Sequence, residues 1–212
     1  MKIILVYRAA SDMAWEERYD AAGVERALAE EREHGAAPVQ VKKGDASAYR
    51  IYTGTDRAAR ETAELLFDFK EPPEATPLLD DVPLRAWQDS PKQRPLSLWR
   101  AMGELQWRTG SPRQPEKRED TLRRAGELTD LLEQKDADCI VIARGLTMKA
   151  LKTVLRRRGY TIDGGSFAHK PLDRMRAMKQ LLRCGGCNHN CPLTNPKCDV
   201  GRNKAKAMKG LG

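Results

Sequence analysis

Asp138-Cys139-Ile140-Val141-Ile142-Ala143-Arg144-Gly145 is the stretch from which the architecture of this chain can be inferred. Its unbroken apolar run is typical of a strand covered on both faces of a parallel sheet. A strong predicted helix over Glu116–Gln134 precedes the stretch, and after Arg144 and Gly145 the chain turns into a helix that ends near Arg158. The stretch therefore predicts a strand–turn–helix unit of the α/β kind.

The same pattern occurs earlier in the chain. Lys2–Tyr7 is another continuous apolar run, and Tyr49–Thr53 is a strand followed by a turn over residues 53–56 and a helix to Leu66. Strands that alternate with helices predict a three-layer α/β fold with a mostly parallel, doubly wound sheet. In such sheets the ligand crevice lies at the carboxyl ends of the strands.

The remaining elements are less regular. Asp20 is the predicted N-cap of a helix that carries Glu31 on the same face as three apolar residues. Thr76–Leu79 is a predicted short strand. Prolines punctuate residues 83–115, where a helix is expected over Ser97–Arg108. The tryptophans of this insertion either line a pocket or pack the insertion onto the core.

The net charge of +8 is concentrated at the end of the chain. Residues 166–212 hold ten Lys or Arg and two Asp, so they carry the whole surplus. We therefore predict an α/β domain over 1–165 and a basic tail over 166–212, which begins with an amphipathic helix over Pro171–Arg183. No apolar run approaches the roughly 20 residues of a membrane span. We expect a cytoplasmic protein without a membrane partner.

Four blocks of the first 160 residues resemble, in order and spacing, the histidine phosphatase superfamily, which has the phosphoglycerate-mutase-like fold. Ile4–Ser11 resembles the family's opening strand, which ends in Arg-His-Gly-Glu-Ser, and Asp20–Ala27 resembles its Thr-x-x-Gly-x-x-Gln-Ala block. Tyr52–Ala63 resembles the Ser-Ser-Pro-Leu-x-Arg-Ala-x-Gln-Thr-Ala block. Val141–Gly145 resembles the late strand that ends in Ser-His-Gly. The resemblance implies the family's fold for this part of the chain, and the cysteine spacing described below adds a small cysteine-rich knuckle at the C-terminus.

The departures from the family pattern affect its catalytic groups. The resemblance places the first family histidine, which becomes phosphohistidine, at Arg8, or at Ala9 if the register shifts by one residue. It places the second histidine at Arg144. The family's second arginine falls beside Arg57, at Ala58.

The family's proton-donating carboxylate falls at Asp81 or Asp80, and both are counted as an acidic part of the pocket. The three histidines of the chain, His34, His169 and His189, lie outside the four blocks. The sequence therefore predicts a pocket that lacks both catalytic histidines.

The chemistry of arginine decides what such a pocket can do. A phosphoryl acceptor needs a free lone pair at neutral pH, which imidazole has and guanidinium lacks. Arginine is nevertheless suited to bidentate contact with phosphate or carboxylate. We therefore predict a catalytically inactive pseudophosphatase that binds a phosphorylated or other anionic ligand, with the anion-binding residues Arg8, Arg57, Arg144 and Thr53.

Two alternatives to a working anion pocket stay open. The arginines could be paired with Asp80, Asp81 or other acids in a relic pocket, because structural ion-pair networks resemble functional sites. The chain could also be a phosphatase with a substitute nucleophile such as Tyr7.

Four cysteines in the tail form the sharpest local motif. Cys184, Cys187, Cys191 and Cys198 have the spacing C-x2-C-x3-C-x6-C, which suits a tetrahedral site of four thiolates. We predict structural zinc, with an iron–sulfur cluster as the alternative because Pro192 directly follows a cysteine. A reactive or disulfide-bonded cluster is the third possibility.

The lysines and arginines around this motif suggest a second functional class. A metal knuckle with basic neighbours could bind nucleic-acid phosphates, which would make the α/β domain a scaffold. Phe167 is the only aromatic residue of the tail, which argues against stacking on single-stranded bases. A solvated basic end that aids solubility or docks on an acidic protein is the simpler alternative.

Metal analysis of the purified full-length protein tests the cysteine motif. We expect one zinc ion per chain and no visible absorption, because zinc has a filled d shell. A brown protein that contains iron would establish the cluster instead, and a metal-free protein would contradict both assignments. Cys139 serves as the control cysteine, since its replacement leaves the metal content unchanged.

Overall fold

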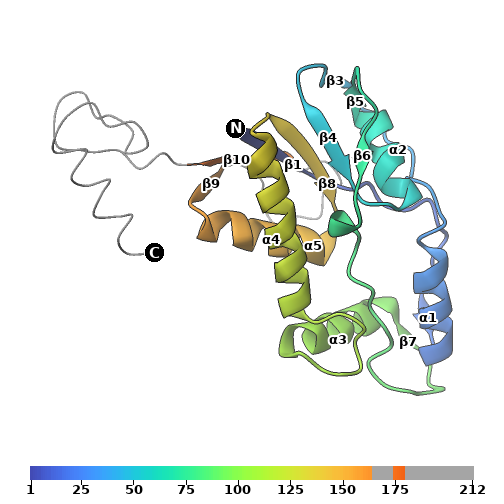
Figure 1. Ribbon diagram of the computed structural model, residues 1–212. Helices are drawn as coiled ribbons and strands as arrows, with labels where there is room; N and C mark the ends of the chain where they lie inside the picture. Colours follow the sequence, from blue (N-terminus) through green and yellow to red (C-terminus); the bar gives the residue numbers. More distant parts are fainter. Residues whose placement is uncertain (164–173, 180–212) are drawn as a thin grey trace, which may run out of the picture. The chain divides into compact units, whose positions relative to one another are not determined.

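The computed structural model describes residues 1–163 and 174–179, and its centre is a six-stranded sheet with the strand order β6-β4-β8-β1-β10-β9 (Figure 1). The strands β6, β4, β8 and β1 run parallel to one another, and β10 is antiparallel to β1. The bounds of these strands are Glu74–Ala75 (β6), Arg50–Thr53 (β4), Cys139–Ala143 (β8), Lys2–Tyr7 (β1), Arg174–Lys179 (β10) and Tyr160–Asp163 (β9). The predicted α/β fold with a mostly parallel sheet is confirmed.

Helices cover the sheet on both faces because its central strand is apolar on both faces. Cys139, Val141 and Ala143 belong to a buried core shared with α4 and α5, whereas Ile140 and Ile142 belong to a core shared with α2. The side chains of a strand alternate between its two faces, so these two cores are the two interfaces of a three-layer structure. The bounds of the helices are Arg57–Leu66 (α2), Arg118–Lys135 (α4) and Gly145–Arg157 (α5).

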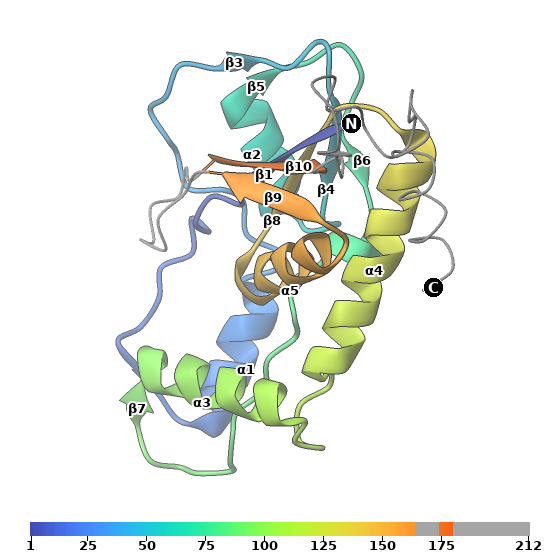
Figure 2. The same ribbon diagram turned by 90° about the vertical axis from the view of Figure 1, so that its left-hand side faces the viewer.

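Two further helices, α1 (Ala21–Glu30) and α3 (Leu96–Thr109), lie together at one end of the sheet (Figure 2). They share a third apolar cluster that includes Val24 and Trp99. The indole of Trp99 donates to the Tyr19 carbonyl at 2.9 Å, and Trp107 donates to Thr121 Oγ1 at 2.9 Å. Both tryptophans are buried and pack the insertion onto the core, which settles the alternatives left by the sequence.

Short elements complete the described part of the chain. Strand β2 (Arg18–Tyr19) pairs with β7 (Arg94–Pro95), and β3 (Gly44–Asp45) pairs with β5 (Phe67–Asp68). The predicted strand over Thr76–Leu79 is wrong, because Pro77–Leu79 form a 3₁₀ helix, η1. Thr76 Oγ1 caps η1 by accepting from the Leu78 N–H at 3.3 Å, and Pro77 occupies its first turn.

The predicted helix over Pro171–Arg183 is also wrong at its centre. Residues Arg174–Lys179 form strand β10, which runs beside β1 from Val6 opposite Arg174 to Lys2 opposite Met178. Pairing with a buried strand outweighs the helical spacing of the apolar residues, because tertiary context overrides a weak local preference. The sheet therefore extends past residue 165. The predicted metal ligands at Cys184, Cys187, Cys191 and Cys198 lie outside the described residues.

None of the helices in the two described ranges combines the length and the apolar character that a membrane crossing requires.

Candidate functional site

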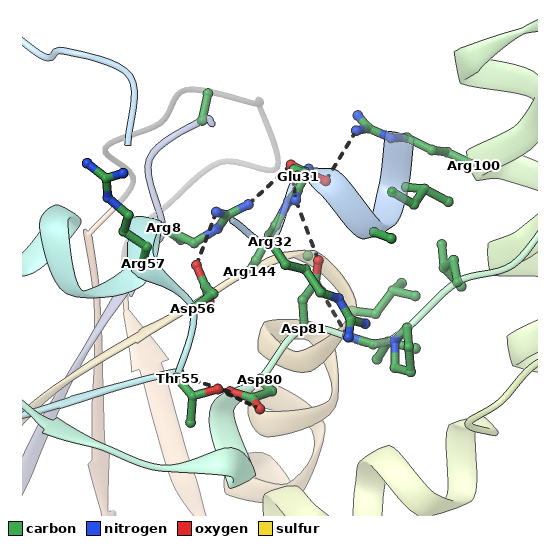
Figure 3. A pocket seen from close by; sticks show the side chains of 18 of the residues that line it. Arg8, Glu31, Arg32, Thr55, Asp56, Arg57, Asp80, Asp81, Arg100 and Arg144 are labelled. Carbon is green, nitrogen blue, oxygen red and sulfur yellow. Dashed lines mark hydrogen bonds and ion pairs between the residues drawn. The ribbon is translucent and has the colours of Figure 1, made fainter. Parts of the chain in front are cut away.

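A cleft of about 1220 Å³ opens at the carboxyl ends of the parallel strands, where the sequence predicts the ligand crevice. Arg8 follows β1 and Arg144 follows β8. Asp56 comes shortly after β4, and Asp81 comes shortly after η1. Helices α1 and α3 close the opposite wall with their own charged side chains. Figure 3 shows that these groups converge, and we call Arg8, Glu31, Asp56, Asp81, Arg100 and Arg144 the arginine–carboxylate cluster.

Arg8 is the most buried arginine of the cluster, with a side chain only 4% exposed. Its backbone N–H donates to the Ala143 carbonyl at 2.9 Å, so the β1–β8 pairing sets its position. Its Nη1 donates to Asp56 Oδ1 at 3.2 Å, and its Nη2 donates to Glu31 Oε1 at 3.3 Å. A buried guanidinium needs such partners, because removing it from water without them costs several kcal/mol.

Arg144 and Arg8 donate to the same carboxylate oxygen, Glu31 Oε1. Arg144 is the residue before α5, and its Nη1 donates to Glu31 Oε1 and lies 3.7 Å from Asp81 Oδ2. No side chain caps α5, and Gly145 at the first position of that helix also lines the cleft. Backbone N–H groups at a helix start favour an anion, so this side of the cleft is electropositive.

Asp56, Glu31 and Arg100 are the members of the cluster that the sequence analysis did not predict as site residues. Glu31 follows the last residue of α1 and is buried, with a side chain 8% exposed. Arg100 reaches it from α3, with 3.8 Å between Nη2 and Glu31 Oε2, and stacks over the Trp15 ring at 4.4 Å. Burial lowers the pKa of Arg100, and the charge of Arg144 acts in the same direction. The placement of Glu31 on an apolar helix face was the available signal, because a carboxylate there needs a cation.

The two acids of the predicted pocket have different environments. Asp80 accepts from the backbone N–H of Thr55 at 2.7 Å and from its hydroxyl at 2.9 Å, so it holds the turn after β4. Asp81 faces Arg144 across the cleft. Burial raises the pKa of Asp81, and the nearby charges of Arg144 and Arg8 oppose that rise.

Arg57 and Thr53 lie apart from the cluster. Arg57 lines the outer part of the cleft, but its side chain is 62% exposed and its Nε donates to Glu61 Oε1 at 2.6 Å. In Figure 3 its guanidinium points away from Glu31. Thr53 is fully buried within β4 and is not among the residues that line the cleft. The structure therefore brings together Arg8, Arg144 and Asp81, but not these two residues.

The cleft contains no histidine among the described residues. His34 lies on another surface, where its Nδ1 is 3.0 Å from Asp12 Oδ1 and its Nε2 is 3.7 Å from Glu30 Oε1. Tyr7 does line the cleft, and its hydroxyl accepts from Lys152 Nζ at 2.9 Å.

The formal charges of the cluster balance when its acids are ionised. Three guanidinium groups, from the ends of β1 and β8 and from α3, face three carboxylates, from the end of α1, the start of α2 and the segment after η1. Each arginine lies within 4 Å of at least one carboxylate oxygen. The fold and site thus define an α/β protein whose arginine-rich cleft contains a charge-balanced cluster.

Comparison with known proteins finds similarity among solved structures alone. No family model matches the chain, and no curated protein matches it. Among solved structures it is similar to a mycobacterial glucosyl-3-phosphoglycerate phosphatase, studied in complexes with VO3, with a TM-score of 0.44 and 17% sequence identity over 74% of this chain and 82% of that one.

The raised pKa of Asp81 predicts a pH-dependent effect of Asp81→Asn. A carboxyl group whose pKa is higher in the folded state destabilises the fold once the pH exceeds its ordinary value, because the unfolded chain releases the proton more readily. We therefore expect Asp81→Asn to raise the free energy of unfolding at pH 7. This gain should disappear below about pH 4, where aspartate is protonated in both states. Urea unfolding at several pH values measures it.

The control for this experiment is Glu64→Gln on the exposed face of α2, which should change stability little at either pH. If Asp81→Asn destabilises the protein at pH 7, the attraction of Arg144 outweighs the effect of burial, and the stated direction of the shift is wrong.

Proposed function

We propose that this chain binds an anionic small molecule, phosphorylated or carboxylated, in the cleft at the carboxyl edge of its sheet. The convergence of Arg8, Arg100 and Arg144 on one oxygen-bearing group is the observation that carries the proposal. Guanidinium groups from three separate elements surround a single carboxylate, and such an arrangement recognises oxyanions by charge-assisted hydrogen bonds. The neighbouring start of α5 adds backbone donors to the same side.

The same proposal assigns no phosphoryl transfer to the cleft. Transfer through a phosphohistidine needs an imidazole with a free lone pair, and none of the described residues that line the cleft supplies one. Arg8 and Arg144, which occupy the positions of the family histidines in the resemblance, stay protonated and offer no acceptor. The proposed role is therefore binding, as in a regulatory or sensing protein of the histidine-phosphatase-like kind.

Tyr7 is a weaker candidate for a substitute nucleophile. Its hydroxyl is already engaged, because it accepts a hydrogen bond from Lys152 Nζ at 2.9 Å and the ammonium lies 4.8 Å from its ring centre. Phosphoryl transfer to tyrosine also needs a base that accepts the phenolic proton, whereas Lys152 Nζ is the donor in this hydrogen bond.

Stabilisation by phosphate tests the binding proposal. Inorganic phosphate at ten times its dissociation constant should stabilise the full-length protein by about 1.4 kcal/mol, which raises the melting temperature by about 3–6 °C for a domain of this size. Arg144→Gln should abolish the shift, because it removes a guanidinium from the centre of the cluster. Differential scanning fluorimetry at constant ionic strength measures it.

Arg57→Gln is the matched control, since it removes the same charge from the same cleft at a position that pairs with Glu61 instead of Glu31. It should retain the shift. The absence of a phosphate shift in the wild type at millimolar concentration would contradict the binding proposal.

Turnover of an aryl phosphate tests the absence of transfer. We expect no hydrolysis above background by the wild type and no acid-labile phosphorylated protein after incubation with the substrate. Hydrolysis that disappears in both Arg8→Gln and Arg144→Gln would overturn this part of the proposal, whereas hydrolysis that survives both changes would come from outside the cleft or from a contaminant.

A further inference from the structure

The Glu31 carboxylate stands where the three arginines would place a ligand's anionic group. Its Oε1 accepts from both Arg8 and Arg144, and its Oε2 faces Arg100 (Figure 3). No other carboxylate of the described chain lies within 4 Å of more than two arginines. The centre of the cluster is therefore already occupied by a group of the protein itself.

The position of Glu31 on its helix does not favour a negative charge. Glu31 directly follows α1, where the unpaired carbonyl groups of the last turn give the helix end a partial negative charge. The carboxylate is also almost completely removed from water. It is the surrounding arginines that hold an ionised group there, and they would hold a different oxyanion for the same reason.

A carboxylate satisfies these arginines incompletely. One oxygen of Glu31 is shared by two guanidinium groups, and the second oxygen lies 3.8 Å from Arg100 Nη2, beyond hydrogen-bond distance. Arg100 Nη2 is buried and makes no hydrogen bond to any described residue. A phosphoryl group presents three oxygens instead of two, so it can give each arginine an oxygen of its own.

We propose that Glu31 is a resident carboxylate that occupies the position of a phosphoryl group, and that the phosphoryl group of the ligand replaces it on Arg8, Arg100 and Arg144. This inference rests on the proposed binding function, and it adds both the class of the ligand and the residue that competes with it. The exchange is non-covalent and leaves the number of protons on the arginines unchanged.

The surroundings of Glu31 allow such an exchange. Residues 31–33 form a turn after α1, and Arg32 and Glu33, which follow Glu31, are exposed and line the cleft. Rotation of the Glu31 side chain moves its carboxylate from the cluster into the water of the cleft, where its solvation is regained. The affinity for the ligand is then lowered by the contacts that Glu31 gives up.

Glu31→Gln tests the exchange directly. The amide keeps the shape of the side chain but removes the negative charge that competes with the ligand for the arginines. Inorganic phosphate should therefore bind the variant roughly tenfold more tightly than it binds the wild type. Isothermal titration calorimetry with phosphate measures the affinity, and acetate should bind the same variant more weakly than phosphate. Glu33→Gln removes a charge from the same cleft and the same turn, and it should change the affinity less than about twofold because exposed charges are screened.

A second variant covers the case in which Glu31→Gln does not fold. Glu31→Asp keeps the negative charge and the charge balance of the cluster, but its side chain is one methylene shorter, so its carboxylate reaches Arg8, Arg100 and Arg144 less well. It should also bind phosphate more tightly than the wild type, though by less than Glu31→Gln. A folded Glu31→Gln or Glu31→Asp variant that binds phosphate no better than the wild type would overturn the exchange, and acetate binding as tight as phosphate would overturn the ligand class.

The outcomes separate this inference from the proposed function. Phosphate binding by the wild type that depends on Arg144 but is unaffected by Glu31→Gln supports the proposed function and contradicts the exchange. Phosphate binding by Glu31→Gln but not by the wild type would show that Glu31 blocks the site and is not displaced, which contradicts both the exchange and the proposed function. Absence of binding by every folded variant contradicts both.

Discussion

The mutual neutralisation of arginines and carboxylates at the edge of the sheet is the constraint on which the rest of this site depends. Arg8 is almost completely buried, and Glu31 and Asp56 are its charged partners. Glu31 is buried in turn, and Arg144 and Arg100 also face it, which offsets the cost of removing these groups from water. Arg8 and Arg144 each share Glu31 with a further carboxylate, so ion pairs link the six residues into one network.

The topology of the sheet explains why residues so far apart in sequence form that network. The carboxyl ends of β1, β4 and β8 lie side by side because these strands are parallel and adjacent, which brings Arg8, Asp56 and Arg144 to the same edge. Helices α1 and α3 then carry Glu31 and Arg100 across from the far wall. The proline-rich insertion thus has two roles, since it packs its tryptophans onto the core and supplies a cation to the cleft.

The chemistry of guanidinium limits what the site does. A permanently protonated group holds oxyanions well and accepts no phosphoryl group, so a cleft built from such groups favours binding over transfer. In the proposed exchange, the contacts of Glu31 with the arginines both stabilise the cleft and compete with a bound ligand. Stability without ligand and affinity for ligand are therefore opposed at a single residue.

The strands and most helices follow from the sequence because their signals are local. Apolar runs mark β1 and β8, and Asp20 caps α1 by accepting from the Gly23 N–H at 2.7 Å. Arg8 and Arg144 each come directly after such an apolar run, and this position is enough to predict that they lie at the carboxyl edge of the sheet. These features depend on neighbours within a few residues, and a sequence displays such neighbours directly.

Only the tertiary structure determined which strands pair with each other and which charged side chains form ion pairs. Arg174–Lys179 form a strand because β1 offers a free edge, although the spacing of their apolar residues suits a helix. Glu31 and Arg100 belong to the site because of a contact between elements more than 60 residues apart in sequence. Arg57, which the sequence predicts in the site, pairs instead with its helical neighbour Glu61. The physical reason is that a buried charge is placed by the sum of the fields around it, and that sum exists only once the chain has folded.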